Sequence, residues 1–474
     1  MKESIIHERI GLMYLSSNLK SQGHEVRLVL VERVGISWVM NLMNSYAPTV
    51  VGYSAMTGEH VGLLAINKIL KEKYKFLAVF GGPHATFFPN LIKEDGCDAI
   101  CIGEGDIAFP EFCRRVEYNE AYWEAPNFIV KHAGEIIRNP LLPLVENLDE
   151  LPFPDRALMY EADPDLLAKG HKIFFSGRGC PYKCTYCFNR KYNEIYQGKG
   201  KVIRYRSEEN LINEICLVKE RYPLDIVLIH DDAFLLKPKD WLIRFANLYK
   251  ERVKLPLSCN VRANLVSEEI IFILKEASLD SVWMGVECGN EEVANNILER
   301  GLTNKQIIMA SRSIKNHGIK LCTENVLGLP MKNSYQIDIQ TLNLNIAIHP
   351  DFAVASLLYP YPGTPIHSYA QTHGFLSRAT PFFETNKRHS LFRFSKKERR
   401  KIENFQKLFS LITRLPFLKS LQDLLCRLPL GKLYSSIFYF WYGYNMKIRI
   451  YPFRSLRKEA GSYIRLWWKL IQKS

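Results

Sequence analysis

The sequence predicts an α/β protein in which two sheet-containing regions precede a helical one. Short apolar runs alternate with amphipathic helical patterns between residues 25 and 105, and six further runs alternate with helical patterns from His171 onward. After residue 370 the pattern is helical and basic. With 474 residues there is room for two or three domains. We therefore expect a Rossmann-like (flavodoxin-like) N-terminal domain, a partial (β/α)6 TIM-type barrel and a C-terminal helical region.

The N-terminal region is expected to form a doubly wound parallel sheet. Its predicted strands cover residues 25–32, 49–56, 76–82 and 99–105, and helical patterns lie at 11–23 and 60–74. In such sheets ligands bind at the carboxyl ends of the strands, where glycine lets the backbone approach a ligand. The candidate binding residues at these ends are Gly81, Gly82, His84, Gly103, Glu104 and Gly105; Ser54 joins them through a resemblance described below.

One strand of that sheet is missing from the pattern. The first strand of a flavodoxin-like sheet lies in its middle, yet only residues 1–9 precede the helical pattern at 11–23. Without this strand, strand 25–32 has no neighbour for its backbone hydrogen bonds. We therefore expect the reading frame to extend upstream into a further strand, or the domain to bind its ligand weakly.

The region after the first sheet is expected to be a linker. Residues 147–165 are rich in proline and acidic residues, and the strand–helix alternation is lost there. The predicted boundaries are 1–125 for the Rossmann-like domain, 126–166 for the linker, 167–370 for the barrel and 371–474 for the C-terminal region.

Six β/α units follow the linker. Their predicted strands cover residues 172–179, 225–232, 257–262, 281–289, 320–330 and 352–360. Two of the intervening helices open with a serine followed by acidic residues, at Ser207 and Ser267, which is typical of a helix N-cap. The functional site of such a barrel lies at the carboxyl ends of its strands.

Three cysteines follow the first barrel strand with the spacing C-x3-C-x2-C, namely Cys180, Cys184 and Cys187. A structural zinc site usually takes four protein ligands, whereas a [4Fe–4S] cluster held by three thiolates keeps one iron open for an outside ligand. With Tyr186 before the third cysteine, the stretch resembles the signature of the radical S-adenosylmethionine (SAM) family. The resemblance implies that the open iron binds SAM and that the reduced cluster cleaves it to a 5′-deoxyadenosyl radical. A zinc knuckle that lacks one ligand is the alternative.

Other strand ends fit the same family. The resemblance implies that Asp231 and Asp232 bind the methionine amino group of SAM. It also implies that Arg262 and Glu287 orient the carboxylate and ribose, and that Gly328 lies near the adenine. An acid at a strand end is also common as a helix N-cap, so each position alone is a weak signal.

Residues 1–125 resemble the cobalamin-binding domain that one branch of this family carries. The segments GGPHAT, GEGD, LPFPDR and YPGTP are similar to that branch, and the resemblance covers about residues 8–370. The D-x-H-x-x-G loop of the cobalamin signature is absent, because the chain has HERIG from His7 onward. The resemblance therefore implies cobalamin without a histidine ligand from the protein.

The branch implies a reaction class and alternatives to it. The first expectation is a C-methyltransferase that acts on an unactivated carbon of a small molecule, with an electron donor such as flavodoxin or ferredoxin. A radical oxidative cyclase or rearrangement enzyme of the same family is the alternative. An RNA methylthiotransferase would need a second cluster, for which only Cys97, Cys101 and Cys113 are candidates. A non-catalytic cobalamin sensor would not need the three intact cysteines of the motif.

Cysteine usage and charge bear on location and partners. The eleven cysteines lack the dense spacing of a secreted disulfide scaffold, and no signal-peptide pattern opens the chain, which together indicate a reducing cytoplasm. The net charge of +14 is concentrated in residues 386–474, where 21 Lys and Arg stand against 4 Asp and Glu. Because the charge is local, it does not indicate nucleic acid binding.

The basic C-terminal region allows two interpretations. It contains 17 aromatic residues within 386–474 and mixes them with Lys and Arg at 434–453 and 463–470. One interpretation is a helical cap with a solvated basic face. The other is a peripheral membrane segment that serves a lipophilic substrate such as an isoprenoid, a lipid or a tetrapyrrole. No run reaches the ~20 apolar residues of a transmembrane helix.

Overall fold

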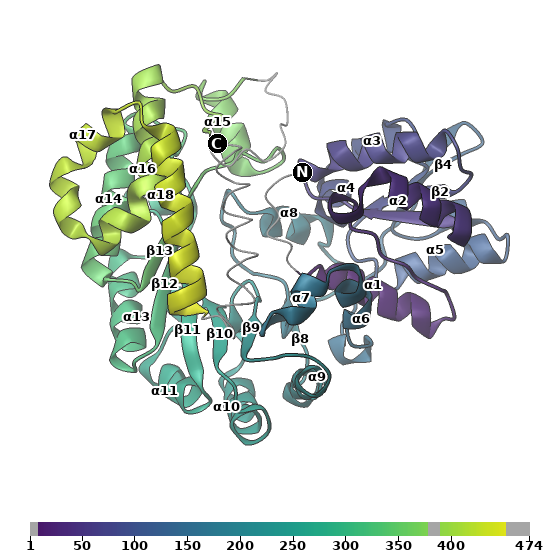
Figure 1. Ribbon diagram of the computed structural model, residues 1–474, viewed down its shortest axis with the longest axis horizontal. Coiled ribbons are helices and arrows are strands. Elements are labelled where there is room, and N and C mark those ends of the chain that lie inside the picture. Colours follow the sequence, from purple (N-terminus) through teal and green to yellow (C-terminus); the bar gives the residue numbers. More distant parts are fainter. Residues whose placement is uncertain (1–7, 378–388, 452–474) are drawn as a thin grey trace. The chain divides into compact units, whose positions relative to one another are not determined.

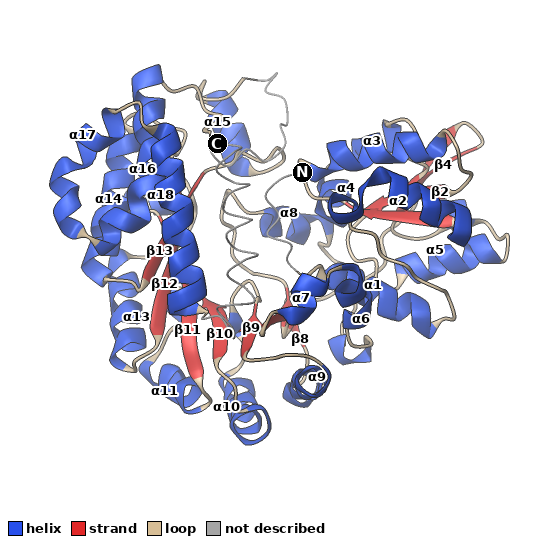
Figure 2. Cartoon of the chain, viewed as in Figure 1, coloured by secondary structure: helices blue, strands red, loops and turns tan. Residues whose placement is uncertain are grey.

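The computed structural model describes residues 8–377 and 389–451, which form two compact units (Figure 1). Among these residues, the first unit contains 8–168 and 192–202, and the second contains the remainder. Both units are α/β, as predicted, and each is built around one main sheet (Figure 2).

The first unit contains a five-stranded sheet in the order β1-β2-β3-β4-β5. Its strands are β1 (Val50–Ser54), β2 (Leu77–Gly81), β3 (Ala99–Cys101), β4 (Phe128–His132) and β5 (Glu135–Arg138). Its helices are α1 (Ile10–Ser21), α2 (Val31–Tyr46), α3 (Glu59–Lys71), α4 (Gly82–Phe87), α5 (Ala108–Glu117), α6 (Arg156–Ala162) and α7 (Pro164–Ala168). The first three strands are parallel, which confirms three of the four predicted strands, and α1 and α3 confirm the two predicted helices.

The prediction of a strand at residues 25–32, the first of the four in the sequence, is wrong. Residues 24–30 are irregular and α2 begins at Val31. Among the described residues no strand lies beyond β1 for this stretch to pair with, and an unpaired strand leaves backbone hydrogen bonds unmet. Its apolar side chains are used differently, because Val29 and Val31 pack against the core of the unit.

Residues 126–166, predicted as a linker, carry regular structure. They contain β4 and β5, a hairpin that extends the sheet in antiparallel fashion, followed by α6 and α7. The hairpin turns at Ala133 and Gly134, which both have positive φ, as a two-residue hairpin turn requires.

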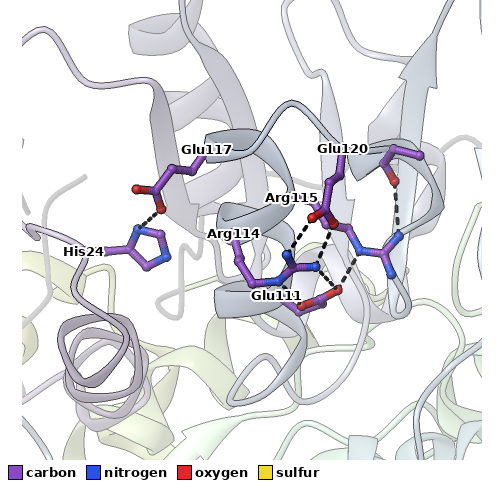
Figure 3. Close-up of polar contacts among 7 residues, drawn as sticks. His24, Glu111, Arg114, Arg115, Glu117 and Glu120 are labelled. Carbon is purple, nitrogen blue, oxygen red and sulfur yellow. Dashed lines mark hydrogen bonds and ion pairs between the residues drawn. The ribbon is translucent and has the colours of Figure 1, made fainter.

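The solvent-facing side of α5 carries a network of ion pairs (Figure 3). Arg114 donates hydrogen bonds to both carboxylate oxygens of Glu111 and of Glu120, over 2.7 to 3.2 Å. Arg115 also donates to Glu111 at 2.7 Å, one helical turn along. Arg114 holds the pKa of Glu111 at about 2, so this carboxylate is ionised across the physiological range.

The second unit contains six parallel strands in the order β13-β12-β11-β10-β9-β6, which confirms the six predicted barrel strands. They are β6 (His171–Phe174), β9 (Ile226–Ile229), β10 (Leu257–Val261), β11 (Leu279–Glu287), β12 (Lys320–Leu327) and β13 (Phe352–Leu357). A separate two-stranded ribbon pairs β7 (Gly177–Arg178) with β8 (Arg204–Tyr205). The sheet is open, so it forms a partial barrel.

Several helices pack against the outer side of this sheet (Figure 1). The helices that precede the C-terminal region are α8 (Phe188–Ile195), α9 (Glu208–Arg221), α10 (Lys239–Leu248), α11 (Glu268–Glu276), α12 (Glu291–Asn296), α13 (Asn304–Asn316), α14 (Ser334–Ile348) and α15 (Pro365–Thr372). The two predicted N-caps are confirmed, because the side chains of Ser207 and Ser267 accept hydrogen bonds from the first turns of α9 and α11.

The C-terminal region is helical, as predicted, and contains α16 (Lys396–Arg414), α17 (Gln422–Arg427) and α18 (Gly431–Tyr444). α16 packs against β13 and α14. Beyond α18, the Tyr451 hydroxyl lies 2.9 Å from Ser258 Oγ and accepts a hydrogen bond from Trp283 Nε1 at 2.7 Å. Within the described ranges, no helix combines the length and the apolar character needed to cross a bilayer. The predicted segment at 463–470 lies outside the described residues.

Candidate active site

The cysteine loop leaves the carboxyl end of β6 and β7 and runs into α8. Cys184 is buried, whereas Cys180 and Cys187 are half-buried. Between them Thr185 anchors the loop, because its backbone N–H donates to Leu298 O at 3.0 Å and its hydroxyl donates to Ile297 O at 2.7 Å. None of the three sulfurs is in a disulfide bond, and all three lie on one short and well-anchored loop.

The donor set fits a cluster better than a single ion. Burial raises the pKa of Cys180 and of Cys187 to about 11, so both are neutral thiols until iron replaces the proton. Among the described residues no three His, Cys, Asp or Glu side chains are arranged to hold one metal ion. A four-iron cluster offers each thiolate its own iron, so its ligands need not converge on one point.

Arg300 contacts several residues of the site at once, and it was not predicted as a site residue from the sequence. Its Nη1 donates to Tyr186 Oη at 3.0 Å and lies 3.8 Å from Cys184 Sγ, and its Nη2 donates to Gly285 O at 2.6 Å. Nη1 also lies 3.8 Å from the carboxylate of Glu287. One buried cation therefore links the cysteine loop to the end of β11. No local signal marks it, because Arg300 follows α12, more than a hundred residues after the cysteines.

Glu287 adopts an unusual backbone conformation, with φ of +64°, which a non-glycine residue rarely adopts. The pairing of β11 with β12 is irregular at this point. A Cβ atom at Gly285 would lie 2.7 Å from Glu287 Oε1 and 3.2 Å from Arg300 Nη2. Burial raises the pKa of Glu287, and Arg300 opposes that shift. A strained, largely buried acid beside a buried arginine is characteristic of functional sites.

The two predicted aspartates after β9 have different surroundings. Asp231 is buried, where Ser176 N–H donates to it at 2.8 Å and Lys237 Nζ lies 2.5 Å away. Asp232 is exposed, and its carboxylate accepts a hydrogen bond from Asn189 Nδ2 at 2.9 Å. Asp231 therefore ties β9 to the end of β6, while Asp232 faces the start of α8 with much of its carboxylate open.

Arg262 and Gly328 lie at the ends of β10 and β12. The guanidinium of Arg262 stacks 3.7 Å from the ring centroid of Tyr182, inside the cysteine loop. Its buried Nε has no hydrogen-bond partner within the described part of the chain. The Gly328 N–H donates to both oxygens of the buried Asp338, at 3.0 and 3.2 Å.

In the first unit, the predicted residues gather at the carboxyl edge of β1, β2 and β3. Thr86 ties two loops of this edge together, because its hydroxyl donates to Gly82 O and accepts from Gly103 N–H, both at 3.0 Å. Gly82 has φ of +85°, and a Cβ atom there would lie 3.2 Å from Ala55 N and from Ser54 Oγ. The exposed side chains of Met56 and Ile107 at the same edge give it an apolar surface.

His84 is buried in a stack of rings at this edge. Its ring centroid lies 3.6 Å from that of His60 and 4.8 Å from that of Phe88, and its Nδ1 lies 3.1 Å from Thr57 Oγ1. Burial lowers the pKa of His84 to about 4, so the ring is neutral at physiological pH. His7 lies outside the described residues.

Tyr196 explains the glycine after β3 and was not predicted from the sequence. Gly103 has φ of +74°, and a Cβ atom there would lie only 1.9 Å from Tyr196 Oη. The same hydroxyl accepts a hydrogen bond from Glu104 N–H at 2.9 Å. A Cβ atom at Gly105 would lie 3.1 Å from Leu15 Cδ2. These loops are therefore shaped partly by the protein's own side chains.

Comparison with known proteins matches each of the two sheet-containing regions to a protein family. Residues 174–338 match the Radical SAM superfamily, and residues 5–113 match the B12 binding domain. The three-cysteine loop and the glycine-lined edge fall in these two matches respectively. The chain is a cobalamin-dependent radical SAM enzyme. Its cofactors are accordingly a [4Fe–4S] cluster, SAM and cobalamin.

This radical SAM enzyme resembles proteins with different names. It is 26% identical over 376 residues to an uncharacterized methyltransferase of Pyrococcus horikoshii, covering 77% of this chain and 79% of the relative. It is 23% identical over 363 residues to an anaerobic magnesium-protoporphyrin IX monomethyl ester cyclase of Rubrivivax gelatinosus, covering 74% and 64%. The structure of the cobalamin-dependent SAM radical enzyme OxsB with aqua-cobalamin bound has a TM-score of 0.70 at 15% identity, covering 99% of this chain and 78% of OxsB.

The remaining cysteines of the first sheet are core residues in this radical SAM enzyme. Cys97 precedes β3 and Cys101 is its last residue, and both are buried, whereas Cys113 is half-buried on α5. Burial raises the pKa of each thiol to about 12. They lack the C-x3-C-x2-C spacing of the cysteine loop and pack in the cores of the first unit, which agrees with their interpretation as packing residues.

Proposed function

We propose that this enzyme transfers a methyl group to an unactivated carbon of a lipophilic small molecule. The observation that carries the proposal is the combination, in one chain, of a three-cysteine barrel loop with a glycine-lined B12-binding sheet. When bound, the cluster would supply the electron that cleaves SAM, and cobalamin would carry the methyl group. The similarity to an uncharacterized methyltransferase supports this reaction over others.

The chain's own residues would hold and orient these groups. We propose that Cys180, Cys184 and Cys187 bind the cluster, with Arg300 fixing Cys184 and Glu287 in place. Asp232, rather than the internally bound Asp231, would meet the SAM amino group, because its carboxylate is exposed.

The remaining SAM contacts come from three further strand ends. The unpaired Nε of Arg262 would meet the SAM carboxylate, and the largely buried Glu287 would meet the ribose. Tyr186 lies against Arg300 beside the third cysteine, and Gly328 would border the adenine. The assignments rest on position in the fold and on unsatisfied polar atoms.

In the first unit, we propose that cobalamin binds at the carboxyl edge of the sheet. The backbone loops at Gly81–Gly82 and Gly103–Gly105 would approach the corrin closely, with Ser54 and His84 between them. The neutral ring of His84 hydrogen-bonds Thr57 and stacks on His60. This arrangement supports the binding of cobalamin without a histidine ligand from the protein.

A radical oxidative cyclisation is the second candidate, because the chain resembles a cyclase that acts on a tetrapyrrole. Both candidates need an external electron donor, for which we propose flavodoxin or ferredoxin. They differ in product mass, since methylation adds a carbon and cyclisation removes hydrogen.

Cluster content and product mass together test the proposal. Anaerobically reconstituted protein should hold about four iron and four sulfide per chain and release 5′-deoxyadenosine on reduction with SAM. Replacing all three motif cysteines with alanine should abolish both. A deletion strain and the same strain complemented with the gene should both be fed methionine with a deuterated methyl group. Only extracts of the complemented strain should contain a product that carries the label. A triple variant that keeps its iron would contradict the cluster assignment, and an unlabelled, hydrogen-poor product would favour cyclisation.

A further inference from the structure

The chain between α16 and α18 turns large apolar side chains toward solvent. We call residues 414–433 the C-terminal face. Its exposed apolar side chains are Leu415, Phe417, Leu421, Leu424, Leu430 and Leu433. Phe417 is 69% exposed and Leu424 is 60% exposed. Single exposed apolar residues are ordinary on a protein surface, but six within so short a stretch form a patch that calls for a partner.

These side chains are not the edge of the core. The core side of the same segment is occupied by Leu418, Leu425 and the fully buried Cys426, which pack into the cluster formed by α16, α14 and β13. A surface helix normally turns polar residues outward. This segment is apolar on its packed side and on its solvent side, so its outer residues leave large apolar side chains in contact with water.

The charges on the C-terminal face are almost all positive. Arg414, Lys419, Arg427 and Lys432 are exposed in the same stretch as the apolar side chains. The one acidic residue, Asp423, is neutralised by Lys401 at 2.5 Å and by Arg427. An apolar row ringed by basic residues is the composition of interfacial membrane-binding segments. The C-terminal face is therefore complementary to a surface with negative charge on the outside and apolar groups beneath.

We propose that the C-terminal face docks on a bilayer that contains anionic lipid. Phe417, Leu421 and Leu424 enter the headgroup region, and the basic side chains contact the lipid phosphates. A nucleic acid would use the charge but leave the apolar row in water, and a protein partner is an outcome that the test distinguishes. The inference deepens the proposed function, since it brings the enzyme to a lipophilic substrate, but it depends on the surface and not on the reaction.

Flotation of the full-length holoenzyme with vesicles tests the proposal. The enzyme should float with phosphatidylcholine–phosphatidylglycerol vesicles and less with phosphatidylcholine alone. The variant F417S/L421S/L424S should bind at least about tenfold more weakly, because each large side chain loses its apolar transfer. The variant K419Q/K432Q should also bind more weakly at low salt, and the difference should shrink as salt rises. The natural enzyme and every variant should be compared by cluster absorbance to establish that they are folded.

A matched control separates this face from general surface hydrophobicity. The variant F272S/M309S removes two other exposed apolar side chains of the same unit, 56% and 58% exposed, and should float like the natural chain. Equal flotation of the triple variant and the natural chain, or no flotation with anionic vesicles at low salt, would overturn the proposal. Lipid-free self-association that the triple variant abolishes, without flotation, would assign the face to protein contacts and overturn it as well. Release of 5′-deoxyadenosine, measured without vesicles, reports on the reaction separately, so failure to dock and failure of the proposed function are distinguishable.

Discussion

At the scale of single residues, Arg300 has the most connected side chain of the candidate active site. Its guanidinium lies between the sulfur of Cys184, the phenol of Tyr186 and the carboxylate of Glu287. Positive charge and N–H donors near a cluster sulfur stabilise the reduced, more negative state of the cluster. We therefore assign Arg300 a positioning and electrostatic role in addition to its structural one.

Replacing Arg300 with methionine should make the cluster harder to reduce. A hydrogen bond to a charged group contributes about 1.5–3 kcal/mol, and part of it differs between redox states, so the potential should fall by on the order of tens of millivolts. Potentiometric titration followed by paramagnetic resonance measures this shift. R190M is the control, because it also removes a positive charge close to the motif, where the Arg190 guanidinium binds the Glu299 carboxylate at 2.9 Å. An unchanged potential in R300M with full iron content would contradict the assigned role.

The cysteine motif was predictable from the sequence, whereas the residues around it were not. Cys180, Cys184 and Cys187 carry their chemistry in their spacing. Arg300 and Tyr196 act through contacts formed by tertiary folding, with partners about a hundred residues away in the chain, and neither belongs to a motif. Sequence reasoning finds residues whose role is set by local spacing and misses those whose role is set by packing.

At the scale of elements, the barrel strands were predictable because each has its own signal. A β-rich run bounded by a helix with a serine N-cap is recognisable without knowledge of its neighbours, as Ser207 and Ser267 show. The stretch at 25–32 has the same composition but no strand to pair with among the described residues. Strand formation depends on a partner, so composition alone overpredicts isolated strands. The β4–β5 hairpin was missed because the proline-rich stretch after it dominated the pattern.

The ion-pair network on α5 makes a prediction about pH. Since Arg114 holds the pKa of Glu111 at about 2, below its ordinary 4.5, the network stabilises the folded state above the unfolded pKa and loses this effect as pH falls toward 2. R114Q should lower stability at pH 7 by about 0.5–1 kcal/mol, the scale of a partly exposed network. The gap in thermal midpoint between R114Q and the natural chain should narrow from pH 7 to pH 4. A gap that widens over this range would contradict the assignment.

At the scale of the whole molecule, the C-terminal region divides its surface between two roles. Its outer side forms the C-terminal face, and its last described turn enters the partial barrel. Ile450 and Tyr451 are buried against the inner side of the sheet, beside Cys322 and Phe352. The sequence predicted a basic helical region, and the helices are present. It did not predict the contact of Ile450 and Tyr451 with the sheet, because that contact depends on how the sheet folds.

Truncation tests whether this inward contact belongs to the barrel core. A chain that ends at Leu430 lacks α18 and Tyr451, so it exposes Phe352 and leaves the indole N–H of Trp283 unpaired. It should lose the cluster or aggregate. A chain that ends at Tyr451 keeps every described contact and is the matched control. Y451A in the full chain should cost about 3–5 kcal/mol, the range for removing a large buried aromatic side chain.

The hydroxyl of Tyr451 can be separated from its ring. Y451F keeps the buried ring and removes only the bonds to Ser258 and Trp283, so it should cost about 1–2 kcal/mol. Thermal unfolding and iron content should be measured on these four chains and on the control that ends at Tyr451. Stability should rank with the natural chain first, then Y451F, then Y451A, and the chain ending at Leu430 last. If the chain ending at Leu430 matched the control in both measurements, the barrel would not need its C-terminal contact, and this region would serve only as the support of the C-terminal face.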